Sequence, residues 1–367
     1  MSFHSNYFHR VSVEILKRRD ALYRATRSFF SESGFLETTT PTLSRDVCVD
    51  RFVRSIPVEI ETCWTEPDSF FETRFDSKDV SQIKRSTFYL QTSPEFCMKR
   101  LVASGAKAIY QICPAFRQGD RGSLHNVEFT MLEWYKTGVD YKSGQLFLAD
   151  VLVKIAAAFA RTLNSRAPMF FNNVDIASYG EVFYEKTRLD PHECSRDDLL
   201  ALANQRQIPY PASYVDPNSP TTKDDWLDLI FSELIQPDLG RESAIILYDY
   251  PASQAQLAKT REVVDPRTKR ARLVTQRYEA FAKGVELANG YYELLDADVL
   301  RSRIAKISDE RRRDGSPELP KESRLLAAMD EGLPECSGCA LGLDRFLMIL
   351  LGKETIDDVV PFPVELA

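Results

Sequence analysis

The sequence FRQGDRGSLHNVEFTMLEWY, residues 116–135, predicts the end of one β-strand, a polar loop and a second β-strand. Residues 108–116 are short and apolar, as expected of a buried strand that the loop terminates. Residues 128–135 fit a strand with a period of two, because successive side chains of a strand point to opposite faces. One face then has Phe129, Met131, Glu133 and Tyr135, and the other has Glu128, Thr130, Leu132 and Trp134. The first face therefore offers an aromatic ring, a carboxylate and a phenol.

Polar residues stand at both ends of the loop. Arg117 lies where the first strand enters it, and His125 and Asn126 lie where it meets the second strand. An arginine can bind phosphate oxygens with two N–H groups, an aromatic ring can stack on a base, and an amide can hydrogen-bond a base edge. This set suits an anionic, aromatic ligand such as a nucleotide. The alternative is a hairpin whose polar loop is only solvated, and this stretch alone does not separate the two.

Phe116-Arg117 followed by Glu128–Tyr135 resembles motif 2 of the class II aminoacyl-tRNA synthetases. The form is that of the lysyl enzymes and, more closely, of their short paralogues, the elongation factor P beta-lysine ligases. With the stretches described below, the resemblance extends from about residue 10 to the C-terminus. It implies an α+β fold, in which an antiparallel sheet is flanked by helices.

Composition limits the class of protein and its partners. The 367 residues, 44% of them hydrophobic, are enough for a buried core in one large domain or two. The net charge of -7 argues against a general attraction to DNA or tRNA, which would need a local basic patch. Seven cysteines without a signal-peptide pattern predict reduced thiols and a cytoplasmic location, and no apolar run approaches transmembrane length. Cys336-Ser-Gly-Cys339 lacks the second pair of ligands that a zinc site needs, so no metal or redox role is expected there.

The N-terminal third predicts a helix and several strands. Residues 11–33 have apolar side chains at helical spacing, Gly34 supplies a stop, and residues 35–41 predict a short strand that ends on a proline. This order resembles motif 1 of the family, about residues 11–41, and implies a homodimer interface. The residues alone favour an amphipathic helix packed inside a monomer. Residues 44–87 predict a strand near residue 60 followed by a surface insertion.

The stretch YLQTSPE, residues 89–95, predicts a strand that enters a Ser-Pro turn before a helix at 98–102. The family has TSPE here, which implies that Glu95 receives the amino group of the amino acid. A carboxylate at this place could equally cap the helix N-terminus. Residues 144–163 predict a helix, and residues 164–240 predict an insertion with a helix near 226–234 and no obvious chemical role. The alternating charges between Arg301 and Arg324 predict a solvated helix face.

Residues 279–293, EAFAKGVELANGYYE, place three carboxylates and an amide in one strand, turn and strand. Such density in apolar sequence is costly unless the charges are neutralised, and Mg²⁺ binds one or two acids together with substrate phosphates. Gly290 is expected to let the backbone turn. The alternative is a surface hairpin with scattered acids.

The C-terminal stretch from Ser337 to Leu351 predicts a glycine-rich opening and then a helix with one apolar stripe. Its GLDR resembles motif 3, about residues 337–351, which implies that Gly342 gives the nucleotide close access and that Arg345 covers the adenine opposite Phe129. The closing DDVVPFP, residues 357–363, also resembles the end of lysyl synthetases.

The resemblance therefore implies a site with three groups of residues. Arg117, Glu286 and Arg345 are the catalytic residues, and Glu279 and Glu286 hold Mg²⁺. ATP is bound by Arg117, Gln118, Gly119, His125, Asn126, Phe129, Glu286, Leu287, Gly342 and Arg345. The amino acid is bound by Ser93, Pro94, Glu95, Glu133, Tyr135, Asn289, Glu293 and Ala340.

Two positions depart from the family pattern. The family usually has a glutamate two residues after the motif 2 arginine, whereas this chain has Gly119, followed by Asp120, which could replace it if the loop is shifted. Lysyl-tRNA synthetases have a glycine where this chain has Ala340, and the ligases have an alanine. One methyl group in a pocket can change the choice between close substrates by about 1 to 3 kcal/mol.

The implied function is ATP-dependent activation of a lysine-type amino acid, (R)-beta-lysine, as an adenylate, followed by its transfer to a lysine of elongation factor P. One alternative is a free-standing synthetase-like enzyme that charges tRNA or a small molecule, and another is a paralogue that binds without catalysis. We expect one catalytic domain over residues 1–367 without an N-terminal anticodon-binding domain. Because the insertion shows no basic stripe and the chain is acidic overall, tRNA and DNA are not expected partners. A membrane is not expected either, because no apolar run approaches transmembrane length.

Overall fold

The computed structural model describes residues 9–62, 84–216 and 221–367. Its strands are β1 Leu36–Glu37, β2 Leu43–Ser44, β3 Ile56–Thr62, β4 Lys84–Leu90, β5 Ala108–Phe116, β6 Glu128–Thr137, β7 Val174–Ser178, β8 Ala244–Pro251, β9 Thr260–Val264, β10 Ala271–Ala282, β11 Val285–Tyr292 and β12 Cys336–Gly342. Its α-helices are α1 Val13–Glu32, α2 Glu95–Ala103, α3 Tyr141–Thr162, α4 Tyr179–Thr187, α5 Arg196–Arg206, α6 Lys223–Ile230, α7 Ala297–Arg313, α8 Arg324–Glu331 and α9 Leu343–Leu350.

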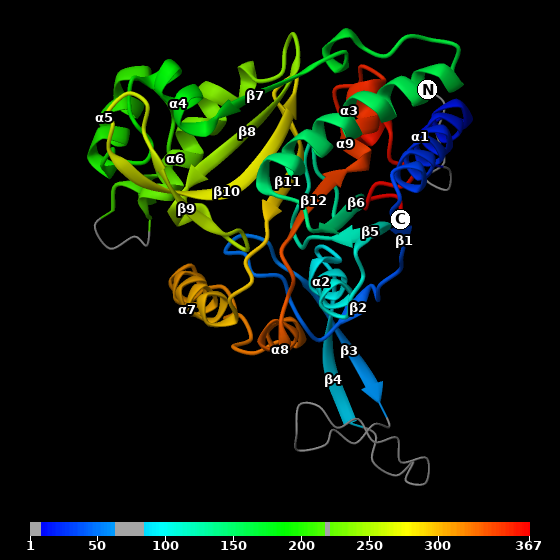
Figure 1. The fold of residues 1–367 in the computed structure, drawn as a ribbon, viewed down its shortest axis with the longest axis horizontal. Helices are drawn as coiled ribbons and strands as arrows, with labels where there is room; N and C mark the ends of the chain where they lie inside the picture. The colour runs from blue at the N-terminus through cyan, green and yellow to red at the C-terminus, as the bar shows by residue number, and fades with distance from the viewer. Residues whose placement is uncertain (1–8, 63–83, 217–220) are drawn as a thin grey trace.

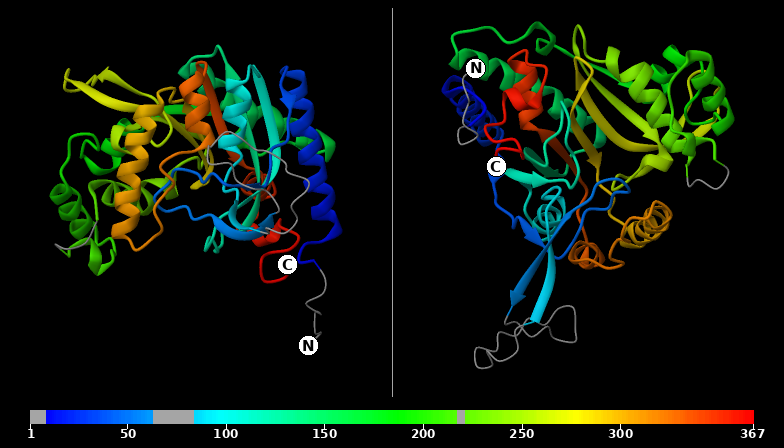
Figure 2. Two further views of the ribbon diagram at one scale, coloured as in Figure 1. Left: turned by 90° about the horizontal axis from the view of Figure 1, so that it is seen from below. Right: turned by 180° about the vertical axis from the view of Figure 1, so that it is seen from behind.

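A large, mainly antiparallel sheet forms the centre of the molecule (Figure 1). Within the described residues it has nine strands in the order β1-β5-β6-β12-β11-β10-β8-β7, with β9 paired to β10. Only the pairs β1 with β5 and β7 with β8 are parallel among those described. A smaller sheet, β2-β4-β3, extends away from the large one (Figure 2). The predicted fold class, an antiparallel sheet with helices against it, is confirmed.

Strand β5 has the predicted bounds, and β6 runs two residues past the predicted end, to Thr137; the predicted alternation holds except at Thr130, which also lines the cavity. Phe116 pairs with Glu128 at the loop, and the register is unbroken down to Ala108 and Lys136. Leu132 and Trp134 point into the hydrophobic core, whereas Glu133 and the other odd-numbered residues from Phe129 to Tyr135 line a cavity on the opposite face. The alternation read from the sequence therefore distinguishes the face of β6 that packs in the core from the face that lines the cavity.

Helices α1, α3 and α9 cover the core side of the sheet (Figure 1). Ser12 caps α1 by accepting a hydrogen bond from the Ile15 amide, and Gly34, with φ +79°, follows its end. Helix α3 is long and apolar enough to cross a membrane by length and composition, which differs from the expectation that no apolar run approaches that length. Half of its most apolar window is buried, and Leu148, Leu152 and Ile155 are fully inaccessible in the core.

The other helices form two further cores. Helices α2, α7 and α8 pack together on the cavity side, next to the small sheet (Figure 2). The insertion predicted at 164–240 contains α4, α5 and α6, which surround the fully buried Trp226 and pack on β8. Arg301 on α7 binds three acidic side chains near the surface, in agreement with a solvated face, but Arg311 on the same helix is buried.

Several predicted boundaries were wrong. The strand expected at 35–41 is only the two residues of β1. The strand expected to enter the Ser93-Pro94 turn begins earlier, at Lys84, and ends at Leu90, and the helix expected from residue 98 begins at Glu95. Residues 63–83, which include most of the predicted surface insertion, lie outside the described residues. The glycine-rich opening of motif 3 is strand β12, in the middle of the sheet. Cys336 and Cys339 therefore point to opposite faces and belong to different cores.

The prediction that Gly290 makes a turn was also wrong. Gly290 lies inside β11, paired with Tyr278, and a Cβ atom there would come within 2.4 Å of the Tyr278 ring. The turn is formed by Lys283 and Gly284, which have φ values of +52° and +77°. The glycine was thus required by close packing and not by backbone conformation.

Candidate active site

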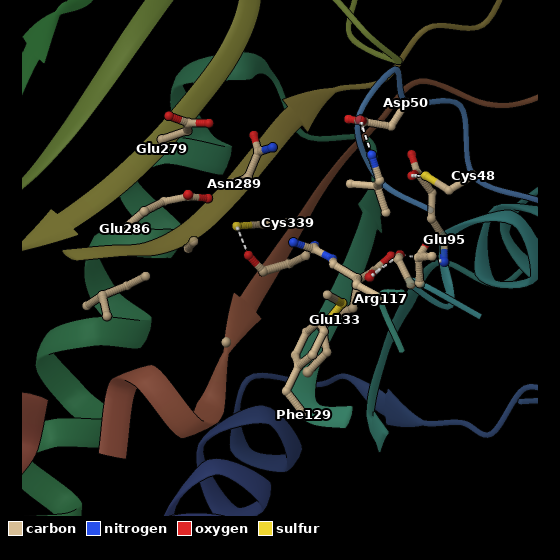
Figure 3. A pocket seen from close by; sticks show the side chains of 18 of the residues that line it. Cys48, Asp50, Glu95, Arg117, Phe129, Glu133, Glu279, Glu286, Asn289 and Cys339 are labelled. Carbon is tan, nitrogen blue, oxygen red and sulfur yellow. Dashed lines mark hydrogen bonds between the residues drawn. The ribbon is translucent and has the colours of Figure 1, made fainter. Parts of the chain in front are cut away.

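The cavity side of β6, β10, β11 and β12 forms the floor of a cavity of about 320 Å³. Figure 3 shows Glu279, Glu286 and Asn289 on one side of it and Glu95, Arg117 and Glu133 on the other. It brings together sixteen of the residues named from the sequence, namely Ser93, Glu95, Arg117, His125, Asn126, Phe129, Glu133, Tyr135, Glu279, Glu286, Leu287, Asn289, Glu293, Ala340, Gly342 and Arg345. Pro94, Gln118 and Gly119 do not line it, but Asp120 does.

Arg117 enters the cavity from the end of β5. Its guanidinium lies 5.1 Å from the centre of the Phe129 ring. Its Nε atom is buried and has no hydrogen-bond partner among the described residues. A buried donor without a partner is costly, so this atom is available for an oxygen ligand such as phosphate. A base that stacks on the same face of Phe129 would displace the guanidinium.

Arg345 lies in the first turn of α9 and lines the cavity near His125 and Glu286. Its Nε donates to the Leu124 carbonyl at 3.1 Å, its Nη1 donates to the Glu286 carbonyl at 3.0 Å, and its Nη2 lies 2.6 Å from His125 Nε2. Burial and the nearby Arg345 lower the pKa of His125, so a neutral ring accepts this hydrogen bond. Above Gly342 a Cβ atom would have no neighbour nearer than 3.9 Å, which leaves room for a flat ligand.

Asn126 is placed differently from the expectation. Its Nδ2 donates to the Glu128 carbonyl at 2.7 Å, and its Oδ1 accepts from the Val364 amide at 3.1 Å. Both ends of the amide therefore hold the chain, and one N–H and one lone pair remain for a base edge.

Glu279 and Glu286 provide the oxygen atoms proposed for magnesium. Glu286 is 40% exposed, and its nearest recorded cation is Arg345 at 3.8 Å. Glu279 is buried, accepts the Tyr250 hydroxyl at 2.6 Å and pairs with Arg277. Burial, and the negative charge of Glu286 as a further cause, raise the pKa of Glu279, against the effect of Arg277. Two neighbouring carboxylates fit an ion that completes its shell with phosphates, and Glu286 is the less occupied of the two.

Glu133 is a buried acid on the cavity floor. It accepts the Tyr135 hydroxyl at 2.6 Å and the Ser93 hydroxyl at 2.8 Å. Burial raises its pKa to about 8, with a further contribution from Glu95. It is therefore mainly protonated at neutral pH and would ionise when a cation binds beside it.

Glu95 and Glu293 share a buried lysine that was not predicted. Lys99 Nζ lies 2.6 Å from a carboxylate oxygen of each, and its side chain is 1% exposed. Burial opposes its charge, but Glu293 and Glu95 raise its pKa, so it is an ammonium. Burial in turn raises the pKa of Glu293. Glu95 begins α2, yet its carboxylate bonds Lys99, so the alternative of a simple N-terminal cap does not describe it.

A chain of hydrogen bonds crosses the cavity from the loop before β3. Gln256 donates to Asp50 at 3.1 Å and accepts the Tyr291 hydroxyl, which in turn accepts Asn289 Nδ2 at 3.0 Å. Arg277 Nε donates to the Asn289 carbonyl oxygen at 3.2 Å. Asn289 is thus held from both ends.

Sequence reasoning missed Lys99, Arg277, Asp50 and Gln256. Lys99 stands four residues after Glu95 on a helix, and Arg277 stands two residues before Glu279 on a strand. Each spacing places the two side chains on the same face, and this signal could have found both residues. Asp50 and Gln256 come from irregular segments, in which no periodicity relates a residue to a face.

Comparison with known proteins identifies the family. A family model described as tRNA synthetases class II (D, K and N) matches residues 4–366. A Yersinia pestis (strain Pestoides F) protein named elongation factor P (R)-beta-lysine ligase is 34% identical over 352 residues, which cover 96% of this chain and 95% of the relative. The protein of the same name from Yersinia pseudotuberculosis serotype O:1b (strain IP 31758) has the same identity and coverage.

These matches confirm the predicted resemblance and the prediction of an ATP-dependent ligase. With a family model that spans nearly the whole chain and a floor of antiparallel strands beneath the expected residues, this protein belongs to the class II tRNA synthetase family of the D, K and N type.

Proposed function

We propose that this protein activates a lysine-type amino acid, (R)-beta-lysine, with ATP and transfers it to a lysine of elongation factor P. The observation that supports this most is the acidic half of the cavity. Glu95, Glu133 and Glu293 are all buried there, and Lys99 balances only part of their potential charge. The names of the Yersinia relatives support this amino acid and this acceptor.

In the first reaction a carboxylate oxygen of the amino acid attacks the α-phosphorus of ATP. The bond from that phosphorus to the bridging oxygen breaks, and pyrophosphate leaves with the electron pair. The protein contributes position and charge more than covalent chemistry. The Nε of Arg117, which has no partner in the part of the chain that the structure describes, would hold an α-phosphate oxygen, and Phe129 and Arg345 would hold the adenine between them.

Glu286, with Glu279, would hold Mg²⁺ together with the phosphates. A bound Mg²⁺ would neutralise charge on ATP and on the leaving pyrophosphate. Arg277 and Tyr250 keep the Glu279 carboxylate in place next to this position.

The amino-acid half suits a substrate with two ammonium groups. One ammonium would lie against Glu133, which would ionise in response, and the other would approach Glu95 and Glu293 beside Lys99. Asn289, held by Arg277 and Tyr291, would accept or donate a further hydrogen bond.

In the second reaction the neutral amine of the acceptor lysine attacks the acyl carbonyl. An amide bond forms, AMP leaves, and the amine loses a proton. We further propose a homodimer through α1 and β1 and a cytoplasmic location. Outward-facing apolar side chains support the dimer, since Val13 is 60% exposed and Leu36 is 67% exposed.

The experiment is to incubate the protein with ATP, Mg²⁺ and either (R)-beta-lysine or α-lysine, and to offer elongation factor P or total tRNA as acceptor. Mass spectrometry of elongation factor P should show addition of one beta-lysine residue, with little charging of tRNA. Efficient tRNA charging without transfer to the protein acceptor would favour the synthetase-like alternative. If no amino acid supports ATP-pyrophosphate exchange, the non-catalytic alternative holds.

A further inference from the structure

The loop between β5 and β6, residues 117–127, is attached to the C-terminal segment, residues 356–365. The Ile356 amide donates to the Ser123 carbonyl at 2.8 Å. The Val364 amide donates to Asn126 Oδ1 at 3.1 Å. Figure 1 shows the C-terminal segment, in red, returning beside α1, β5 and β6. The loop that leads from Arg117 to His125 thus rests on a part of the chain more than two hundred residues away.

Arg121 connects the two segments with all of its guanidinium nitrogens. Its Nε and Nη2 donate to Glu365 at 2.6 and 3.0 Å, and Nη2 also donates to Asp357 at 2.9 Å. Its Nη1 donates to the carbonyls of Gly122 and His125 at 3.2 and 3.3 Å. Nε and Nη2 of the guanidinium therefore bind the C-terminal segment, and Nη1 binds two carbonyl groups of the loop itself.

The loop closure lies directly behind the nucleotide site. Gly122 and His125 also exchange backbone hydrogen bonds of 3.1 and 3.3 Å, which form a tight turn. The imidazole of His125 then meets Arg345. A chain of contacts therefore leads from the C-terminal segment through Arg121 and His125 to the arginine proposed to cover the adenine.

The strength of this connection comes from geometry and partial burial. Ion pairs between exposed side chains contribute little, because water and salt screen them. Here Arg121 is 28% exposed and Asp357 is 12% exposed, whereas Glu365 is 56% exposed, so burial strengthens mainly the contact with Asp357. Asp357 also pairs with Arg10 at 3.2 Å. A planar guanidinium that meets two carboxylates and two carbonyls fixes an orientation, which a single point charge would not.

We infer that Arg121 is a positioning residue, which holds the 117–127 loop in its nucleotide-binding form by tying it to Asp357 and Glu365. The inference rests on the proposed ATP site. Because Arg121 does not line the cavity, its loss should alter the preorganisation of Arg117 and His125 and leave the amino-acid half unchanged.

The test compares Arg121→Gln, Arg121→Lys and Asp357→Asn with the wild-type protein. Arg312→Gln is the matched control, since Arg312 on α7 binds Asp309 and Glu318 at 2.8 and 2.7 Å and none of these three residues lines the cavity. ATP-pyrophosphate exchange gives KM for ATP, KM for the amino acid and kcat. Calorimetric titration with ATP alone gives a binding constant that does not depend on turnover.

We expect Arg121→Gln to weaken ATP binding and raise KM for ATP about tenfold, with kcat and the amino-acid KM within about twofold of wild type. Arg121→Lys should recover part of the loss, and Arg312→Gln should match wild type. Asp357→Asn combined with Arg121→Gln should add less than the product of the single effects, because both remove one contact.

Unchanged ATP affinity in Arg121→Gln, or an equal rise in both KM values, would overturn the inference. If the wild-type protein catalyses no exchange, the proposed function fails, while the calorimetric titration still decides the role of Arg121.

Discussion

The proposed nucleotide half of the cavity, around Arg117 and Glu286, and the proposed amino-acid half, around Glu133 and Glu293, stabilise their charges in different ways. In the nucleotide half, Glu286 is 40% exposed, and Arg117 keeps a buried N–H group without a partner among the described residues. In the amino-acid half, Glu133 and Glu293 are each 1% exposed and are already hydrogen-bonded or ion-paired within the protein. The half with Arg117 and Glu286 combines one buried N–H group that has no partner among the described residues with a partly exposed acid beside the buried Glu279, whereas the other half holds two acids that are almost fully buried and have raised pKa values.

The two halves therefore differ in how far ligand binding depends on the ionisation of protein side chains. Phosphates bring their own charge, so the nucleotide half needs only donors in fixed places. A carboxylate in a low-dielectric pocket is costly when ionised, so the amino-acid half stores protonated acid until a cation arrives.

Glu286→Gln should reduce ATP-pyrophosphate exchange by about a hundredfold or more, because it removes a charge at the metal position and keeps the shape. The thermal unfolding midpoint should stay within a few degrees of wild type, since Glu286 is partly exposed. Glu335→Gln is the control, because Glu335 is a 63% exposed acid that pairs with Lys259. Exchange at the wild-type rate in Glu286→Gln would rule out the metal assignment.

The KM for the amino acid should depend on pH through Glu133. Its pKa of about 8 lies above the usual glutamate value, so below pH 8 the free protein binds a proton that a substrate ammonium must expel. The KM should therefore fall as pH rises from 6 to 8, by up to about tenfold per pH unit for one proton. The same raised pKa means that Glu133 favours folding less as pH rises through this window, because the folded state binds more protons than the unfolded one.

Glu133→Gln should remove most of that pH dependence and leave the pH profile of the KM for ATP unchanged. Any remaining slope would come from Glu293, whose pKa is also raised by burial. A variant with the full wild-type slope would show that Glu133 does not control substrate binding.

Ala340→Gly should give the smallest effect, a shift of about 1 kcal/mol in the ratio of kcat/KM values toward α-lysine over beta-lysine. Ala340 is paired with Glu133 on one side and with Asn289 on the other, so its methyl group stands between two of the proposed substrate contacts. If both substrates slow equally, Ala340 only fills space.

The sequence by itself determined the elements whose pattern is local. The bounds of β5 and the two faces of β6 follow from the strand period. The i to i+4 relation of Glu95 and Lys99 was missed, because the predicted helix began only at residue 98, whereas α2 begins at Glu95. Most of the residues named from the three motifs line one cavity in the structure. Their spacing in the sequence could indicate this because members of one family share a fold. The pattern could not show that Gly290 lies within a strand, since only the Tyr278 ring across the sheet requires the absence of a Cβ atom.

Tertiary structure alone decided the contacts between segments distant in sequence. Asp50 reaches Asn289 through Gln256 and Tyr291, and Arg121 reaches the C-terminal segment, although no periodicity relates these positions. Burial decided the charge states as well, because Glu133 ionises normally in an extended chain and becomes a weak acid only when the sheet and α2 enclose it. The sequence specifies which groups are present, whereas the fold sets their distances and their access to water, on which pKa and affinity depend.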